Sequence, residues 1–289
     1  MNLLGVVELA ALGPDCAKLV VAKDESGVAM AAAFALMRRG VKGLHLVTVP
    51  VSGLQADMLI GAGCVATLET SGITLAEFGP APCFSRAVKS GSLHLKDATC
   101  PAIYAGLQAA QKGLPFMPLR GILETDVLAH RPDWRVIDNP FAPGDRIVVL
   151  PAITPDVALF HAPLADRFGN VFIGRQRELM LLAHAARSTL VTAEHIVEGN
   201  LLEDEARSGS VIPALYVTAV AHAPRGAWPL AFGDEYAADA AWLANYVAEA
   251  RSPAGFARVL ESLAGAAGGA HIANRAGDDH GALAAGVAA

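Results

Sequence analysis

The chain has 289 residues, of which 53% are hydrophobic and 17% charged, and its formal net charge at pH 7 is −6. This is the composition of a packed globular protein with a sizeable core, and it excludes a disordered chain. The acidic balance, without any cluster of lysines and arginines, argues against a nucleic-acid partner, and no apolar run approaches the ~20 residues that a membrane span requires.

The spacing of cysteines and histidines indicates whether the chain could bind a metal, and its N-terminal residues indicate the cellular compartment. The four cysteines show no C-x-x-C spacing, so the sequence predicts neither a zinc site nor a disulfide framework. His94, His184 and His195 likewise lack metal-ligand spacing. Residues 1–7 carry no Lys or Arg, unlike the start of a secretory signal. We expect a cytoplasmic protein that holds no metal.

Strands and helices alternate through the first half of the chain. A buried strand is expected over residues 18–22 and an Ala-rich helix over 28–39, with Ser26 as its N-cap and Gly40 closing it. The next expected elements are a strand at 44–49, a helix at 54–61, strands at 65–69 and 93–96 with a helix at 78–90 between them, and a helix at 101–112.

The second half continues this alternation and ends in a compositional change. Its expected elements are a Pro-rich irregular excursion at 134–143, strands at 146–152 and 157–161 that resume the sheet, a turn at 166–170, a buried helix at 178–186, a strand at 189–193 ending at Glu194, and helices at 236–251 and 253–263. The remaining residues are rich in Ala and Gly and have too few large apolar side chains to offset their ordering entropy. We therefore predict one domain over 1–263 and a flexible tail over 264–289.

This order of elements indicates an α/β fold. Alternating strands and helices favour a mainly parallel open sheet with helices on both faces. Right-handed crossovers then bring all the strand-to-helix loops to one edge of the sheet. Such sheets bind ligands in the crevice beyond the carboxyl ends of their strands, and Glu194 is expected to face it.

Several separated blocks resemble one protein family. They are the D-R-x-G-N turn at 166–170, the buried helix after it, the V-T-x-E-x-I-V segment at 191–197, and shorter blocks at 106–110, 114–116, 118–121, 213–215 and 223–227. Together they resemble the first, or α, subunit of family I coenzyme A transferases of the glutaconate CoA-transferase type, and its hydrolase-like relatives. The resemblance covers roughly residues 15–262 and implies the NagB/RpiA-like fold of that family.

The resemblance also implies a reaction and a partner. Enzymes of this family move coenzyme A between carboxylic acids, and a glutamate that attacks the thioester ends as a glutamyl-CoA intermediate. That glutamate belongs to a β-type subunit, and its serine-glutamate-asparagine-glycine pattern is not found here. We expect this chain to carry half a site in a hetero-oligomer, with CoA as a substrate and no permanently bound cofactor.

The loop after the first strand departs from the family pattern. The resemblance predicts a Gly-Gly-Phe loop whose backbone N–H groups line the oxyanion and CoA pocket, whereas residues 23–27 contain only Gly27. Either the oxyanion hole is built differently around Ser26 and Gly27, or Glu25 does acid–base work and the reaction is not standard transfer. The simpler alternative is that Asp24 and Ser26 cap the following helix.

Three further positions are candidates with ordinary alternatives. Cys100 lies at a helix start, where partial positive charge favours a reactive thiolate, although a free cysteine is commonly a small buried hydrophobe. Arg120 could hold a substrate carboxylate or a CoA phosphate, or a neighbouring acid. Gly72 follows a strand and could approach substrate, while Glu69 before it is expected to be a solvated carboxylate. His161 is expected to be a hydrogen-bonded core histidine.

The sequence leaves the reaction open. CoA transfer is the first hypothesis, and hydrolysis of a thioester or of a carbon–carbon bond in a CoA-linked cyclic diketone is the second, made more plausible by the altered loop. A non-catalytic scaffold or ligand-binding subunit on the same fold is the third.

Overall fold

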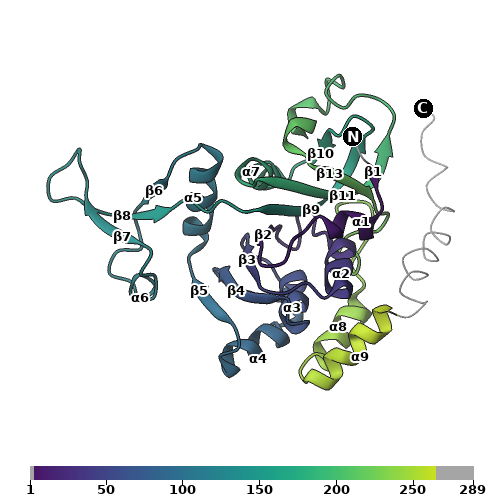
Figure 1. Ribbon diagram of the computed structural model, residues 1–289, viewed down its shortest axis with the longest axis horizontal. Helices are drawn as coiled ribbons and strands as arrows, with labels where there is room; N and C mark the ends of the chain where they lie inside the picture. Colours follow the sequence, from purple (N-terminus) through teal and green to yellow (C-terminus); the bar gives the residue numbers. More distant parts are fainter. Residues whose placement is uncertain (1–2, 265–289) are drawn as a thin grey trace.

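The computed structural model describes residues 3–264, without the side chain of residue 264, and is built on one large sheet (Figure 1). Eight parallel strands follow the order β1-β13-β11-β9-β2-β3-β4-β5, and two short antiparallel strands, β10 and β12, are attached through β9. The strands are β1 (Leu3–Leu4), β2 (Lys18–Val21), β3 (Leu44–Thr48), β4 (Val65–Thr70), β5 (His94–Asp97), β9 (Val157–Asp166), β10 (Val171–Phe172), β11 (Ser188–Val197), β12 (Val211–Ile212) and β13 (Ala219–His222). The predicted parallel α/β fold is confirmed.

The sheet is buried on both faces, which explains its continuous apolar strands. Alternate side chains of a strand point to opposite faces, and in β2 Leu19 and Val21 enter one hydrophobic cluster while Val20 enters the other. Val20 is also in register with Val47 of β3 and Ala158 of β9. A parallel strand covered on both sides reads as an unbroken hydrophobic run.

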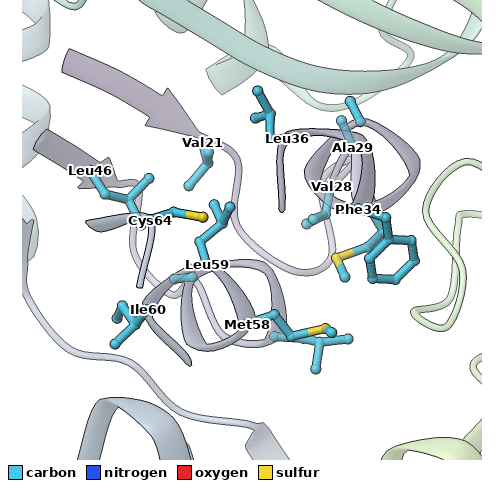
Figure 2. Close-up of a cluster of buried hydrophobic side chains, with 14 of the residues drawn as sticks. Val21, Val28, Ala29, Phe34, Leu36, Leu46, Met58, Leu59, Ile60 and Cys64 are labelled. Carbon is cyan, nitrogen blue, oxygen red and sulfur yellow. The ribbon is translucent and has the colours of Figure 1, made fainter. Parts of the chain in front are cut away.

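Helices form a layer on each side of this sheet. The first cluster contains side chains of α1 (Val6–Ala11), α2 (Met30–Arg39), α3 (Leu54–Gly61), α4 (Pro82–Ser90), α8 (Ala240–Glu249) and α9 (Pro253–Ala264). The second contains those of α5 (Cys100–Gln111) and α7 (Arg177–Ala185). Figure 2 shows the first cluster, in which Leu59 of α3 and Leu36 of α2 lie near Val21 of the sheet.

A second, three-stranded sheet projects from the main body, at the left of Figure 1. It is antiparallel, has the order β6-β8-β7 and carries the short helix α6 (Asp126–Ala129); its strands are β6 (Phe116–Leu119), β7 (Arg135–Asp138) and β8 (Arg146–Pro151). The prediction that residues 146–152 resume the main sheet is therefore wrong. The Asn139 N–H donates to the Asp145 carbonyl (2.7 Å) and closes a turn that pairs β8 with β7.

Several predicted boundaries also move. Residues 76–78 form a separate 3₁₀ turn, η1 (Ala76–Phe78), and α4 begins only at Pro82, which occupies its first turn. Helix α8 begins at Ala240 because Asp239 caps it, accepting the Trp242 N–H at 3.0 Å. Two more 3₁₀ turns, η2 (Ser208–Ser210) and η3 (Ala214–Tyr216), follow β11. The predicted tail lies outside the described residues except for residue 264, the end of α9.

Candidate active site

The parallel strands bring three loops to one edge of the main sheet. These are residues 23–27 after β2, Ser71 and Gly72 after β4, and the start of α5 after β5. Because the carboxyl ends of neighbouring parallel strands share an edge, this is the edge where such a sheet binds ligands. Five of the six predicted site residues lie at this edge: Glu25, Ser26, Gly27 and Gly72 on the loops, and Cys100 at the start of α5.

Ser26 fixes the first loop to the opposite helix layer. Its hydroxyl donates to the carboxylate of Glu178 at the start of α7, and Lys23 Nζ lies 3.3 Å from the same carboxylate. The prediction that Ser26 caps the next helix is wrong, because α2 begins at Met30 and no side chain caps it. Glu178 was not predicted as a site residue, and its only sequence signal is an acidic side chain in the first turn of a buried helix.

Gly27 is held by a close backbone approach that only glycine permits. Its φ is +112°, and a Cβ atom there would lie 2.1 Å from the His161 carbonyl oxygen. The His161 N–H donates to the Gly27 carbonyl at 2.7 Å. The Gly27 N–H donates to no group of residues 3–264. This amide is therefore a donor without a partner among the described residues, on the loop where the resemblance predicts a Gly-Gly-Phe sequence.

Asp24 caps a helix, but a different one from the helix predicted. Its two carboxylate oxygens accept the N–H groups of Gly53 (2.9 Å) and Leu54 (3.2 Å) at the start of α3. Burial raises the pKa of Asp24 to about 6; the two backbone hydrogen bonds oppose this rise and the charge of Glu25 adds to it. Asp24 therefore joins the β2 loop to α3.

Glu25 is the free carboxylate of this loop. Its side chain is exposed and forms no ion pair or hydrogen bond with residues 3–264, while its backbone carbonyl accepts Nε2 of Gln176 at 3.2 Å. Glu25 and Asp24 line a cavity of about 290 Å³ between the β2 loop, α3, η1 and α8. A carboxylate without a partner at the mouth of a cavity is available for proton transfer.

Cys100 occupies the first turn of α5 and is exposed, so the alternative of a buried hydrophobe is wrong for this cysteine. Its Sγ lies 3.3 Å from Oγ of Ser71, which joins the β4 and β5 loops. One turn further along α5, burial and the charges of Glu178 and Cys100 raise the pKa of Tyr104. Tyr104 therefore lies close enough to interact electrostatically with both Glu178, which holds Ser26 of the β2 loop, and the Cys100 thiol.

Gly72 and Arg120 differ in their placement. Gly72 has a φ of +148° and donates its N–H to Thr70 Oγ1 at 3.0 Å, which shapes the loop beside Cys100. Arg120 follows β6 in the second sheet and makes a bidentate ion pair with Asp145, whose pKa it lowers to about 2. Of the two interpretations of Arg120, the structure shows the second, in which Arg120 pairs with a neighbouring acidic side chain.

A buried network behind the β2 loop supports it. His161, a core histidine as expected, contacts Thr192 Oγ1 through Nδ1 and the Glu194 carboxylate through Nε2, both at 2.9 Å. Glu194 also accepts the Arg225 N–H at 2.6 Å and the Tyr236 hydroxyl at 3.3 Å. Burial raises the pKa of Glu194, but the hydrogen bonds from His161 and Arg225 outweigh it, so the pKa is lowered.

Glu69 corrects another expectation, because it is buried rather than solvated. It is 2% exposed, and its carboxylate pairs with Arg131 Nη2 at 2.7 Å and His45 Nε2 at 3.1 Å. Burial raises the pKa of Glu69, yet His45, Arg131 and Lys96 together bring it below the ordinary value. Arg131 precedes β7, so this ion pair ties the projecting sheet to the main one.

A metal-binding cluster and a membrane-spanning helix are both absent from the described residues. Among residues 3–264, no group of three or more His, Cys, Asp and Glu side chains is arranged to hold a metal ion. In the same part of the chain, no helix combines the length and the apolar character of a membrane span.

The fold and the site define the class: an α/β protein whose loops gather at the carboxyl edge of a parallel sheet. Comparison with known proteins gives the family. The family model described as Coenzyme A transferase matches residues 23–223. The chain belongs to the coenzyme A transferase family.

The relatives carry more than one activity in their names. The chain is 33% identical over 206 residues to the A-type subunit of the 3-oxoadipate CoA-transferase of Pseudomonas knackmussii, covering 69% of this chain and 70% of the relative. It is 33% identical over 220 residues to the A-type subunit of the glutaconate CoA-transferase of Acidaminococcus fermentans, covering 69% and 67%. It is 29% identical over 234 residues to the cholesterol ring-cleaving hydrolase IpdA subunit of Rhodococcus jostii, covering 78% of both chains.

Solved structures agree with this relationship. The glutaconate coenzyme A-transferase of Acidaminococcus fermentans superposes with a TM-score of 0.83 at 25% identity, over 91% of this chain and 88% of the other. The decarboxylase AibA/AibB superposes with a TM-score of 0.80 at 29% identity, over 91% and 98%. One fold therefore carries transferase, hydrolase and decarboxylase names among similar proteins.

Proposed function

We propose that this chain is the α subunit of an enzyme that moves coenzyme A between carboxylic acids, and that it works with a β-type subunit which supplies the nucleophilic glutamate. Family membership, and relatives that are themselves named as one subunit of a CoA-transferase, support the partner. The observation that carries the proposal is the β2 loop, which Ser26 and Gly27 fix at the carboxyl edge of the sheet with the exposed Glu25 on it.

In this proposal the partner's glutamate attacks the thioester carbonyl carbon and expels the CoA thiolate. The thiolate then attacks the resulting anhydride at the glutamyl carbonyl, which releases the acyl group as a carboxylate and leaves a glutamyl-CoA thioester. The Gly27 N–H is suited to stabilise an oxyanion in these steps. These steps move no proton, so Glu25 beside them would act as a base only where water is the acceptor. Cys100 with Ser71 would border the same site. CoA is a substrate, and the complex would work in the cytoplasm.

Hydrolysis is the second candidate, and Glu25 favours it. A free carboxylate in a loop where the family has glycines can take a proton from water, so water could replace the second acid as acceptor. The similarity to the ring-cleaving hydrolase subunit is consistent with this candidate.

The fate of CoA distinguishes the two candidates. The complex with its β-type subunit is incubated with acyl-CoA without an acceptor acid, and both subunits are weighed by mass spectrometry. Transfer predicts CoA bound to a glutamate of the partner, and the formation of acetyl-CoA once acetate is added as the acceptor acid. Thioester hydrolysis predicts continuous release of free CoA and no adduct. Hydrolysis of a carbon–carbon bond predicts no free CoA and no adduct, and an acyl-CoA that gains the mass of one water. A CoA adduct on this chain would contradict the assignment of the nucleophile.

A further inference from the structure

The cavity beside Glu25 has a lining that separates classes of acyl group. Its volume of about 290 Å³ is close to the lower end of ligand pockets, which starts at roughly 300 Å³. The walls are mostly apolar and include Leu54 of α3, Leu75 and Phe78 around η1, Leu230, and Leu243 and Val247 of α8. Such walls favour a hydrocarbon group over a polar one.

The polar part of the lining is entirely acidic. Asp24, Glu25 and Glu77 line the cavity, and none of the residues that line it is Lys, Arg or His. Asp24 is already bound to the start of α3, while the exposed side chains of Glu25 and Glu77 form no ion pair or hydrogen bond with residues 3–264. Two unpaired negative charges at the opening repel anions. The phosphates of CoA and a second carboxylate on an acyl group are therefore both disfavoured here.

We infer that this cavity receives the hydrocarbon part of an uncharged, monocarboxylic acyl group, so that the enzyme prefers apolar acyl-CoA to acyl-CoA with a second carboxylate. The inference rests on the proposed function and names its substrate class. Glu25 at the opening then lies where the thioester end of the acyl chain emerges. This class differs from the dicarboxylic acids in the names of the two transferase relatives.

Turnover by the assembled complex tests this class directly. The value of kcat/KM should rise from acetyl-CoA through butyryl-CoA to hexanoyl-CoA, about fourfold for each added methylene, which corresponds to about 0.8 kcal/mol. Hexanoyl-CoA should exceed glutaryl-CoA at least tenfold, and Glu77→Gln should reduce this ratio severalfold. A complex that prefers glutaryl-CoA would overturn the inference.

A filled cavity provides the second test. Ala238 is exposed and lines the cavity, so Ala238→Trp can occupy it without disturbing the core. We expect this variant to lower kcat/KM for hexanoyl-CoA at least tenfold and that for acetyl-CoA less than twofold. Ala206→Trp, at an exposed position that does not line the cavity, is the matched control and should change neither. Equal losses for both substrates, or no loss, would overturn the inference.

Binding to the chain alone separates this inference from the proposed function. Hexanamide, a neutral probe, should give a binding signal with the isolated chain in ligand-observed NMR. The Ala238→Trp chain should give no such signal, and the Ala206→Trp chain should give it unchanged. Glutarate should not bind. A complex that is inactive on every acyl-CoA while hexanamide binds in this way would contradict the proposed reaction only. Glutarate binding, or hexanamide binding that Ala238→Trp leaves unchanged, would contradict the cavity's assignment.

Discussion

Replacement of Glu25 by Gln tests whether the altered β2 loop takes part in the chemistry. The change removes the charge and base strength of an exposed side chain that has no ion pair within residues 3–264. Because this charge forms no described ion pair and is only the smallest contribution to the raised pKa of Asp24, the free energy of unfolding should change by no more than about 0.5 kcal/mol. If Glu25 moves a proton, turnover of the assembled complex should fall roughly tenfold to a thousandfold, a loss of about 1.4 to 4 kcal/mol of transition-state stabilisation.

The assay is kcat/KM of the complex with hexanoyl-CoA, with urea unfolding of the subunit measured in parallel. Glu77→Gln is the matched control, since Glu77 is a second exposed carboxylate on the same cavity, and it should change hexanoyl-CoA turnover less than about threefold. Small and equal effects of both changes would refute the reasoning. Glu25 would then be only a surface charge, and the chemistry would belong to the partner subunit.

Three further predictions concern stability. Because the pKa of Asp24 is raised to about 6, its contribution to stability is present below about pH 4 and is lost as the pH rises through 6. In urea unfolding between pH 4 and 7, the wild type should lose roughly 1–3 kcal/mol of stability relative to Asp24→Asn, a range that allows for the partial exposure of Asp24. Parallel pH profiles of the two proteins would count against this. Glu69→Gln should lower the free energy of unfolding by about 2–4 kcal/mol, since it leaves Arg131 buried with only Asp133 as a charged partner; an unchanged urea midpoint would contradict the buried pair. Removal of residues 265–289 should shift the melting temperature by no more than a few degrees, and a larger drop would show that this segment packs on the domain.

Much of the fold could be predicted from local patterns. The strand at β2, the helix α2 with Gly40 in the left-handed conformation at its end, and the following strand β3 all follow from buried runs and chain breakers. The second sheet could not be predicted, because a run such as that of β8 indicates a strand but not the strand it pairs with. Its pairing depends on the turn that joins it to β7.

Local patterns also predict part of the candidate site. Loop positions such as Glu25 and Cys100 follow from being just beyond predicted strands, so the sequence alone could place them at the sheet edge. Partners such as Glu178 for Ser26, or Arg131 for Glu69, lie 152 and 62 residues away along the chain. No local pattern indicates which distant residues meet, and the burial of Glu69 could not be anticipated without its partner.

The central claim, that this chain carries half of an active site, is tested most directly by one comparison of acyl-CoA turnover. The purified chain, its β-type partner and the complex of the two are assayed at equal concentration with hexanoyl-CoA and acetate. We expect no turnover by either of the two chains alone and formation of acetyl-CoA by the complex. Full turnover by this chain without any partner would contradict the claim.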